Sequence, residues 1–228
     1  MQSSIYDESV AFSSSYSELI QKAYDNNHLI YITTLTWIFK VNVNNIDLIK
    51  LHNNFNVENV IIQMNKNKQN TQFYNQITLK FVNISTKSIK IFKNGQIQVT
   101  GLSSYFESID INTLLLGWLN EFIPLTNSQP YEMINNSQKI AMINLSVNTY
   151  PTQLIKLTDF CKIMKNDKNI LRCTYNPENY RGVNVKLTTG VSMFVFHTGN
   201  IIMSNQSIHN LKDGYMKMYK LLLRHLIF

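Results

Sequence analysis

Aromatic and cationic residues recur along this chain at nearly constant separations. The recurring pairs are Tyr74 and Tyr180, Lys80 and Lys186, each 106 residues apart, and Phe92 and Phe196, 104 residues apart. Such spacing indicates two copies of one supersecondary unit, neither of which buries its apolar face alone. Two copies pair most simply about a pseudo-dyad. The repeat is therefore suited to a two-fold partner, and duplex DNA is one.

The charge of the chain points in the same direction. Its 228 residues carry a net charge of +7, with a pI near 9.3, which favours a polyanionic partner. Lys, Asn, Ile and Tyr are all abundant, as an AT-rich coding sequence would also make them. Charge alone thus leaves nucleic-acid binding open.

The residues that usually carry catalysis are scattered. The histidines stand far apart, and no carboxylate pair, metal-ligand spacing, nucleophile elbow or phosphate loop is present, so we expect no enzyme, cofactor or metal. Cys161 and Cys173 are expected to be buried and reduced, which fits a reducing compartment. No signal peptide or membrane span is predicted.

Periodicity predicts the same order of elements in each copy. The first copy, 29–123, should contain a strand, a short helix, three strands and a long helix, at 35–43, 46–52, 74–82, 88–92, 96–100 and 107–123. The second copy, 139–228, repeats this order at 140–149, 152–164, 183–187, 192–196, 200–204 and 208–226. Between them lies a linker, 124–138. No element is predicted for 53–71.

The N-terminal segment, 1–28, precedes both copies. Residues 1–16 are Ser-rich and aperiodic, so we expect a mobile arm followed by a short helix at 18–24.

Alternation along the strands predicts an exposed face. Residues on the same side as Phe92 are Asn94, Gln96, Gln98 and Thr100, and those on the side of Phe196 are Thr198, Asn200, Ile202 and Ser204. A buried row would not be so polar. The face is interpreted as a ligand surface, with an ordinary solvated sheet face as the alternative.

These elements, with three sequence segments, resemble the TATA-box-binding protein (TBP) family. The segments are Tyr175–Gly182 (YNPENYRG), Ser192–Ser204 (SMFVFHTGNIIMS) and Ile89–Gly101 (IKIFKNGQIQVTG). Two others, Gln96–Phe122 and Ala141–Pro151, resemble still more the divergent TBP-like proteins of nucleocytoplasmic large DNA viruses. The resemblance implies an α+β fold, the TBP-like saddle. In it, two pseudo-symmetric repeats form one curved antiparallel sheet with helices on its convex face.

The resemblance also implies a DNA-binding site on that sheet. Phe92 with Tyr74, and Phe196 with Tyr180, match the family's aromatic wedges, and Lys80 and Lys186 match its phosphate-contacting Arg residues. Gln98, Thr100, Ile202 and Ser204 match further contact positions. The alternatives are packing for the aromatic residues and solvated surface for the lysines.

The first strand of each copy departs from the family pattern. The family has an Asn in each, at positions that align with Thr36 and Met142, and two residues on stand Ile38 and Asn144. The paired amides are thus replaced, which argues against the usual TATA preference.

The implied function is that of a transcription initiation factor that binds and bends promoter DNA through the minor groove. Glu178 matches a position that contacts transcription factor IIB; a solvated loop acid is the alternative. The implied partners are AT-rich double-stranded DNA, a transcription factor IIB-like protein and RNA polymerase machinery, with a monomer on DNA and no membrane. The implied location is a viral factory or virion, or otherwise the nucleus. The competing hypothesis is a degenerate TBP-fold module that binds only proteins.

Overall fold

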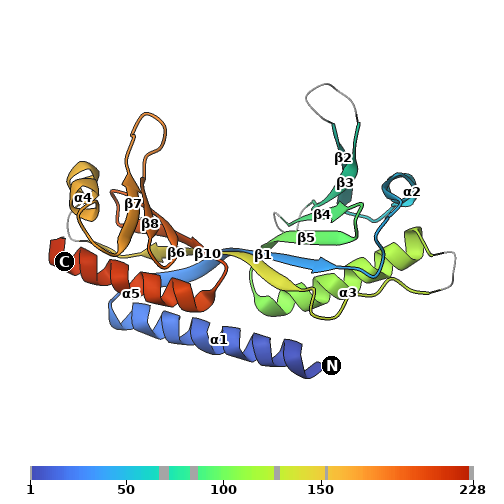
Figure 1. Cartoon of the computed structure of the whole chain (residues 1–228), viewed down its shortest axis with the longest axis horizontal. Coiled ribbons are helices and arrows are strands. Elements are labelled where there is room, and N and C mark those ends of the chain that lie inside the picture. Colours follow the sequence, from blue (N-terminus) through green and yellow to red (C-terminus); the bar gives the residue numbers. More distant parts are fainter. Residues whose placement is uncertain (1, 67–71, 83–86, 126–128, 152–153, 226–228) are drawn as a thin grey trace. The chain divides into compact units, whose positions relative to one another are not determined.

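The computed structural model describes residues 2–66, 72–82, 87–125, 129–151 and 154–225. Ten strands form one sheet in the order β2-β3-β4-β5-β1-β6-β10-β9-β8-β7 (Figure 1). The strands divide between two compact units, so each is described separately. The repeat-1 unit is Thr34–Ala141, and the repeat-2 unit is Met1–Thr33 with Met142–Phe228.

The repeat-1 unit contains most of the first strand, four further strands and two helices. Their bounds are β1 Leu29–Lys40, α2 Leu48–Asn54, β2 Val60–Lys66, β3 Gln72–Phe81, β4 Ser88–Phe92, β5 Gln96–Leu102 and α3 Tyr105–Phe122. A hairpin turn that contains the pair Asn94-Gly95 joins β4 to β5. Gly95 there has φ +82°, and a Cβ on it would lie 2.0 Å from the Val43 carbonyl oxygen, so glycine is required.

The repeat-2 unit has the same order of elements after an additional N-terminal helix. Their bounds are α1 Gln2–Asp25, β6 Lys139–Asn148, α4 Leu157–Met164, β7 Ile170–Thr174, β8 Val183–Leu187, β9 Ser192–Val195, β10 Asn200–Asn205 and α5 Ile208–His225. The strands β2 and β7, which end the sheet, were not assigned from the sequence.

Each unit buries one face of its strands against helices. In the repeat-1 unit, Trp37 lies edge-on to Tyr105 of α3, with ring centroids 5.2 Å apart. The buried strand residues alternate with half-exposed ones, as expected for a sheet with one covered face. The repeat-2 unit follows the same pattern, with Leu211, Tyr215, Met218 and Leu222 of α5 buried.

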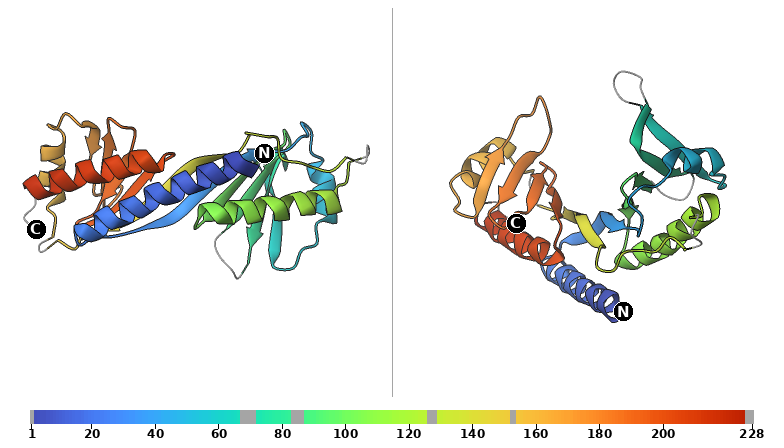
Figure 2. Two further views of the ribbon diagram at one scale, coloured as in Figure 1. Left: turned by 90° about the horizontal axis from the view of Figure 1, so that it is seen from below. Right: turned by 45° about the vertical axis from the view of Figure 1, so that its right-hand side comes forward.

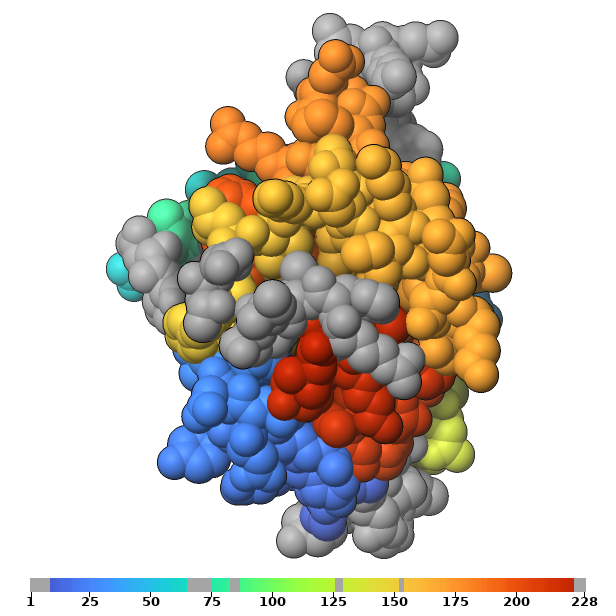
Figure 3. All heavy atoms as spheres, turned by 90° about the vertical axis from the view of Figure 1, so that its left-hand side faces the viewer, coloured from blue at the N-terminus to red at the C-terminus, as the bar shows by residue number. Residues whose placement is uncertain are grey.

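The mobile arm expected at residues 1–16 was wrong, whereas the helix predicted at 18–24 is part of α1, which is one helix from Gln2 to Asp25 that packs on α5 (Figure 2). Phe12, Leu19 and Ala23 are buried, and Ser9 and Ser15 share that buried set. These small polar residues lower the apparent hydrophobicity of the buried stripe, which explains why periodicity missed it. In Figure 3, α1 (blue) lies directly against α5 (red).

Polar contacts join α1 and the chain after it to α5. Glu18 forms an ion pair with Lys212 (2.7 Å), and the Ser15 hydroxyl lies 3.3 Å from His209 Nε2. His28 Nδ1 is 2.9 Å from the Tyr215 hydroxyl. Burial lowers the pKa of His28 below its usual value, so the neutral imidazole is favoured.

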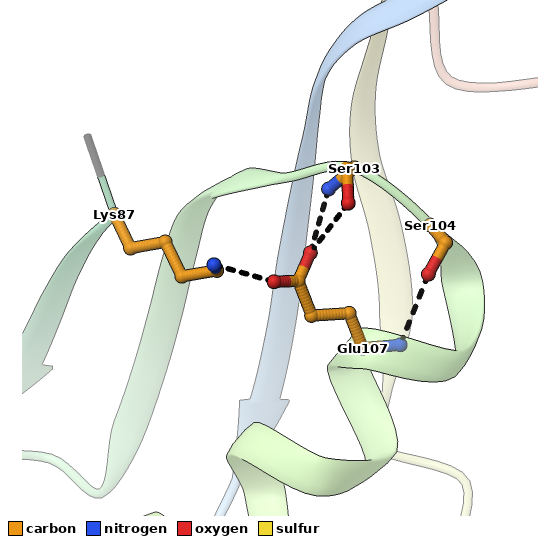
Figure 4. A network of polar contacts seen from close by, with 4 residues as sticks. All are labelled: Lys87, Ser103, Ser104 and Glu107. Atoms are coloured by element: carbon orange, nitrogen blue, oxygen red, sulfur yellow. Dashed lines mark hydrogen bonds and ion pairs between the residues drawn. The ribbon is translucent and has the colours of Figure 1, made fainter. Parts of the chain in front are cut away.

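The N-terminus of α3 is held by a compact polar network (Figure 4). The Ser104 hydroxyl accepts from the Glu107 amide, while the Glu107 carboxylate accepts from the amide and hydroxyl of Ser103 and pairs with Lys87. Burial alone would raise the pKa of Glu107, but the bonds from Lys87 and Ser103 outweigh burial and lower it. The sequence Ser-x-x-Glu thus fixes where α3 begins.

None of the described helices is both long and apolar enough to cross a bilayer.

Candidate nucleic-acid interface

The half-exposed face of the repeat-1 unit contains most of the predicted site residues of that repeat. Across β3, β4, β5 and β1, neighbouring residues run in the order Lys80, Ser88, Thr100 and Thr36. The next row on the same face runs Thr78, Lys90, Gln98 and Ile38. Phe92 ends β4, opposite Gln76 of β3. Thr36 is 9% exposed, so it is the most buried of the predicted residues on this face.

The repeat-2 unit has matching rows across β8, β9, β10 and β6. The first row runs Lys186, Ser192, Ser204 and Asn144, and the second runs Asn184, Phe194, Ile202 and Ser146. The register therefore makes Lys80 equivalent to Lys186, Thr100 to Ser204, and Gln98 to Ile202. The two units thus present the same grid of positions, each on its own half-exposed face.

The strand register corrects one pairing of positions expected from the sequence. Thr36 faces Thr100, whereas Asn144 faces Ser204, so Asn144 is the counterpart of Thr36. Met142 is 38% exposed and lies two residues before that position. The constant offset of 106 residues does not hold in these strands, which is why the sequence paired Thr36 with Met142.

Asn144 is held in place by its neighbours. Its Oδ1 accepts a hydrogen bond from the Ser204 hydroxyl at 2.6 Å, and its backbone carbonyl accepts from the Thr33 hydroxyl at 3.1 Å. Because the side-chain Oδ1 is engaged by Ser204, the side-chain amide presents its NH₂ group as a donor.

Three aromatic rings gather on the face of the repeat-2 unit. The Tyr180 ring lies 4.8 Å from Phe194 and 5.9 Å from Phe196, centroid to centroid. A Cβ on Gly182 would approach the rings of Phe196 and Tyr180 to 3.1 and 3.2 Å. Gly182 thus leaves room for the rings, and Tyr180 stays 46% exposed. In the repeat-1 unit, Tyr74 belongs to β3, and its side chain lies outside the described part of the structure.

The two predicted phosphate-contacting lysines differ in their surroundings. Lys80 is exposed. Lys186 is half-buried, and its Nζ donates to the Gly190 carbonyl at 2.7 Å and to the Ser192 hydroxyl at 2.9 Å. Lys186 must exchange contacts within its own chain for a phosphate, whereas Lys80 projects into solvent.

Lys90 and Phe194 are among the grid residues that were not predicted as site residues, and neither was the adjacent Gly182. Alternation could have found the first two, because Lys90 and Phe194 stand two residues before Phe92 and Phe196. Glu178 lies apart from the strands, exposed in the loop after β7, where its backbone amide donates to Asn176 Oδ1.

The candidate catalytic residues are not grouped. Within the described ranges, no cluster of three or more His, Cys, Asp or Glu residues could hold a metal ion. Cys161 and Cys173 are buried free thiols with their sulfurs 3.3 Å apart. Burial, with the hydrogen bond to Cys161, raises the pKa of Cys173 to about 12, so it stays protonated.

Comparisons with known proteins agree with this arrangement. No protein-family model matches the chain. Over 191 residues, 73% of this chain, it is 25% identical to a "TATA-box-binding protein-like" protein of Acanthamoeba polyphaga mimivirus, and it spans 52% of that relative's length. The TBP of Methanococcus jannaschii matches with a TM-score of 0.63 and 18% identity, over 86% of this chain and 98% of that chain. The predicted fold class and the resemblance to TBP-like proteins are therefore confirmed.

Proposed function

We propose that this chain, a divergent TBP-like protein, is a transcription initiation factor that binds and bends promoter DNA through the minor groove. The observation that carries the proposal is the matching register of the two units. Phe92 ends β4 and Phe196 directly follows β9, and in each hairpin the amide of the turn glycine, Gly95 or Gly199, donates to the Phe carbonyl at 3.0 Å, so the two rings stand at equivalent, half-exposed positions. A half-exposed aromatic ring at the same position of both repeats adds little to the core, and it suits contact with a duplex.

The mechanism is that of TBP itself, carried over from the family. Aromatic side chains enter base steps, unstack them and kink the duplex toward the major groove. Unstacking costs a few kcal/mol for each step, and the larger interface with the bent duplex offsets that cost. Phe92 and Phe196 would act as wedges, and Tyr180 and Tyr74 would stack beside them.

Electrostatics supports a polyanionic ligand. The net charge is +7, and the faces carry Lys80, Lys90 and Lys186. Lysine acts as a point charge on phosphate and does not grip it bidentately. We expect these residues to contribute affinity that salt weakens, without sequence preference.

The central positions support a preference for AT-rich DNA that is unequal between the halves. Asn144 offers an amide donor to the acceptors of an A·T minor groove, whereas its counterpart Thr36 offers a nearly buried hydroxyl. Thr100 and Ser204 add hydroxyls next to them. Only one half thus retains the amide that the family has in both.

Recruitment of transcription machinery is the second part of the proposal. Glu178 is exposed and available to a basic surface of a transcription factor IIB-like protein. On α3, three large apolar residues are exposed, Phe106, Ile109 and Leu114, and they suit a protein partner such as a component of the polymerase machinery. The factor would bind DNA as a monomer, since it already holds both repeats.

The exposed apolar side of α3 also favours a second candidate function. In it, the chain retains the TBP fold only as a protein-interaction module. Lys186 is already satisfied within its own chain, which lowers its value as a phosphate ligand. Direct measurement of DNA binding separates the two functions.

The test is fluorescence anisotropy with an AT-rich duplex of about 20 base pairs. We expect the wild-type chain to bind, and Phe92→Ala with Phe196→Ala to weaken binding by roughly 1–3 kcal/mol per ring, the usual value of stacking on a base. Leu154→Ala, which removes a 69% exposed residue outside both faces, is the matched control and should bind like wild type. Absence of wild-type binding would favour the interaction module.

A further inference from the structure

The two faces have the same register but unlike chemistry in their second row. Lys90 lies between Thr78 and Gln98 in the repeat-1 unit. The equivalent Phe194 lies between Asn184 and Ile202 in the repeat-2 unit. Gln98 and Ile202 are therefore one position of the repeat, occupied by an amide in one half and by a hydrocarbon in the other.

The repeat-2 position is apolar and crowded by rings. Phe194 stacks edge-on against Tyr180, at 4.8 Å and 60°. Neither Ile202 nor Phe194 carries a group that donates or accepts a hydrogen bond. A base edge that packs against this pair therefore gains no hydrogen bond from it.

The side chains at the repeat-1 position can accept and donate hydrogen bonds. Gln98 Nε2 donates to the Thr100 hydroxyl at 3.4 Å, which turns the side-chain Oε1 toward other donors. Lys90, next to it, brings an ammonium group with three donors. Both side chains are half-exposed on the same face.

We propose that Gln98 and Ile202 give the two faces different base-pair tolerances. The proposal rests on minor-groove binding, the proposed function. The minor groove of an A·T pair presents only acceptors, and a G·C pair adds the guanine N2 amino donor. The Gln98 Oε1 can accept from that amino group. Ile202 would cover the guanine amino group without accepting a hydrogen bond from it, and an unsatisfied buried donor is strongly disfavoured.

A fixed orientation on asymmetric DNA follows. The repeat-1 face accommodates a G·C pair, and the repeat-2 face requires A·T pairs. A duplex with A·T pairs in one half and a G·C pair in the other is therefore bound with the repeat-2 unit on the A·T half.

Three duplexes of equal length test the tolerance by fluorescence anisotropy. One has A·T pairs in both halves, one has a single G·C pair in one half, and one has a G·C pair in each half. We expect the wild-type chain to bind the first two within about threefold of each other. The third should bind roughly fivefold to tenfold more weakly, the lower end of the roughly 1–3 kcal/mol that one mismatched base pair costs.

Reciprocal substitutions assign the effect to single residues. Gln98→Ile should weaken binding of the one-sided G·C duplex roughly fivefold relative to binding of the all-A·T duplex. Ile202→Gln should restore binding of the two-sided G·C duplex toward that of the one-sided duplex. Because neither change alters charge, the salt dependence should stay that of wild type.

Orientation is read by cleavage from a tethered iron chelate. Asn94→Cys and Thr198→Cys each place a single exposed thiol at equivalent turns, while the native thiols are buried. On the one-sided duplex, chelate at position 198 should cut the A·T half, and chelate at position 94 should cut the G·C half. On the all-A·T duplex, each should cut both halves.

The outcomes separate this inference from the proposed function. Suppose that wild type binds the all-A·T duplex tightly, and that Gln98→Ile leaves the ratio of affinities for the one-sided and all-A·T duplexes unchanged. This result would overturn the inference and leave the proposed function intact. Equal cleavage of both halves of the one-sided duplex would do the same. Failure of wild type to bind the all-A·T duplex would overturn both.

Discussion

In the repeat-2 unit the outer side of α5 is covered by α1, whereas in the repeat-1 unit the same side of α3 exposes large apolar residues. Positions in the two helices can be matched by counting from the serine that precedes each, Ser104 and Ser207. His209 and Lys212 of α5, which contact α1, then correspond to the exposed Phe106 and Ile109 of α3. The two repeats therefore share their register and their core, and differ on the outer sides of their long helices. The outer side of α5 is covered by α1 of the same chain, whereas that of α3 leaves large apolar side chains exposed.

The largest expected effect comes from breaking the cover of α5. Leu19 of α1 is completely buried, so Leu19→Ala removes a packed side chain and leaves a cavity. We expect a loss of about 2–5 kcal/mol in the free energy of unfolding, measured by urea titration. Ile20, its neighbour, is 41% exposed. Ile20→Ala should change stability by less than about 0.5 kcal/mol; equal losses for the two variants would mean that α1 does not pack as described.

A smaller effect on stability is expected from mild acid, through His28 of the repeat-2 unit. Burial lowers the pKa of His28 in the fold below the value near 6.5 of the unfolded chain. The unfolded state thus binds more protons as pH falls. The contribution of neutral His28 is fully present above about pH 6.5 and declines below it.

His28→Gln should remove this part of the pH dependence, because glutamine does not titrate. Thermal unfolding between pH 5 and pH 7.5 should give a steeper fall in Tm for wild type than for the variant. Parallel curves for the two proteins would contradict a neutral, buried His28 beside Tyr215.

The smallest effect distinguishes the equivalent lysines of the two faces. Exposed Lys80 is available to a phosphate, and Lys80→Ala should weaken DNA binding uniformly across sequences and lower the salt slope by about one. Lys186 already donates to Gly190 and Ser192, so Lys186→Ala should change the slope less. Affinities measured from 50 to 200 mM salt would show this, and a larger change for Lys186 would reverse the comparison.

The parts of the fold that the sequence predicted are those with clear periodicity or turn chemistry. The strands at Ser88–Phe92 and Val183–Leu187 have the predicted bounds, and the hairpin at Gly95 follows from its Asn-Gly pair. The long helix α3 begins two residues before its prediction, because the Ser104 and Glu107 network marks its start. Local signals of this kind are sufficient because each is completed within a few residues.

The missed parts depend on tertiary contacts. The helix α1 buries serines at Ser9 and Ser15, which no apolar pattern records. The terminal strands β2 and β7 pair on one side only and show weak alternation. The equivalence of Thr36 with Asn144 follows only from their pairing with Thr100 of β5 and Ser204 of β10. For the site, alternation identified the face but not the gathering of Phe194 with Tyr180.

If the equivalent faces bind one duplex, Phe92 and Phe196 act on it as wedges and bend it. The most direct measurement is energy transfer between dyes at the two ends of an AT-rich duplex, with and without the protein. We expect binding to shorten the end-to-end distance, and Phe92→Ala with Phe196→Ala to abolish the shortening while the protein stays folded. Saturated binding of wild type with an unchanged distance would contradict it.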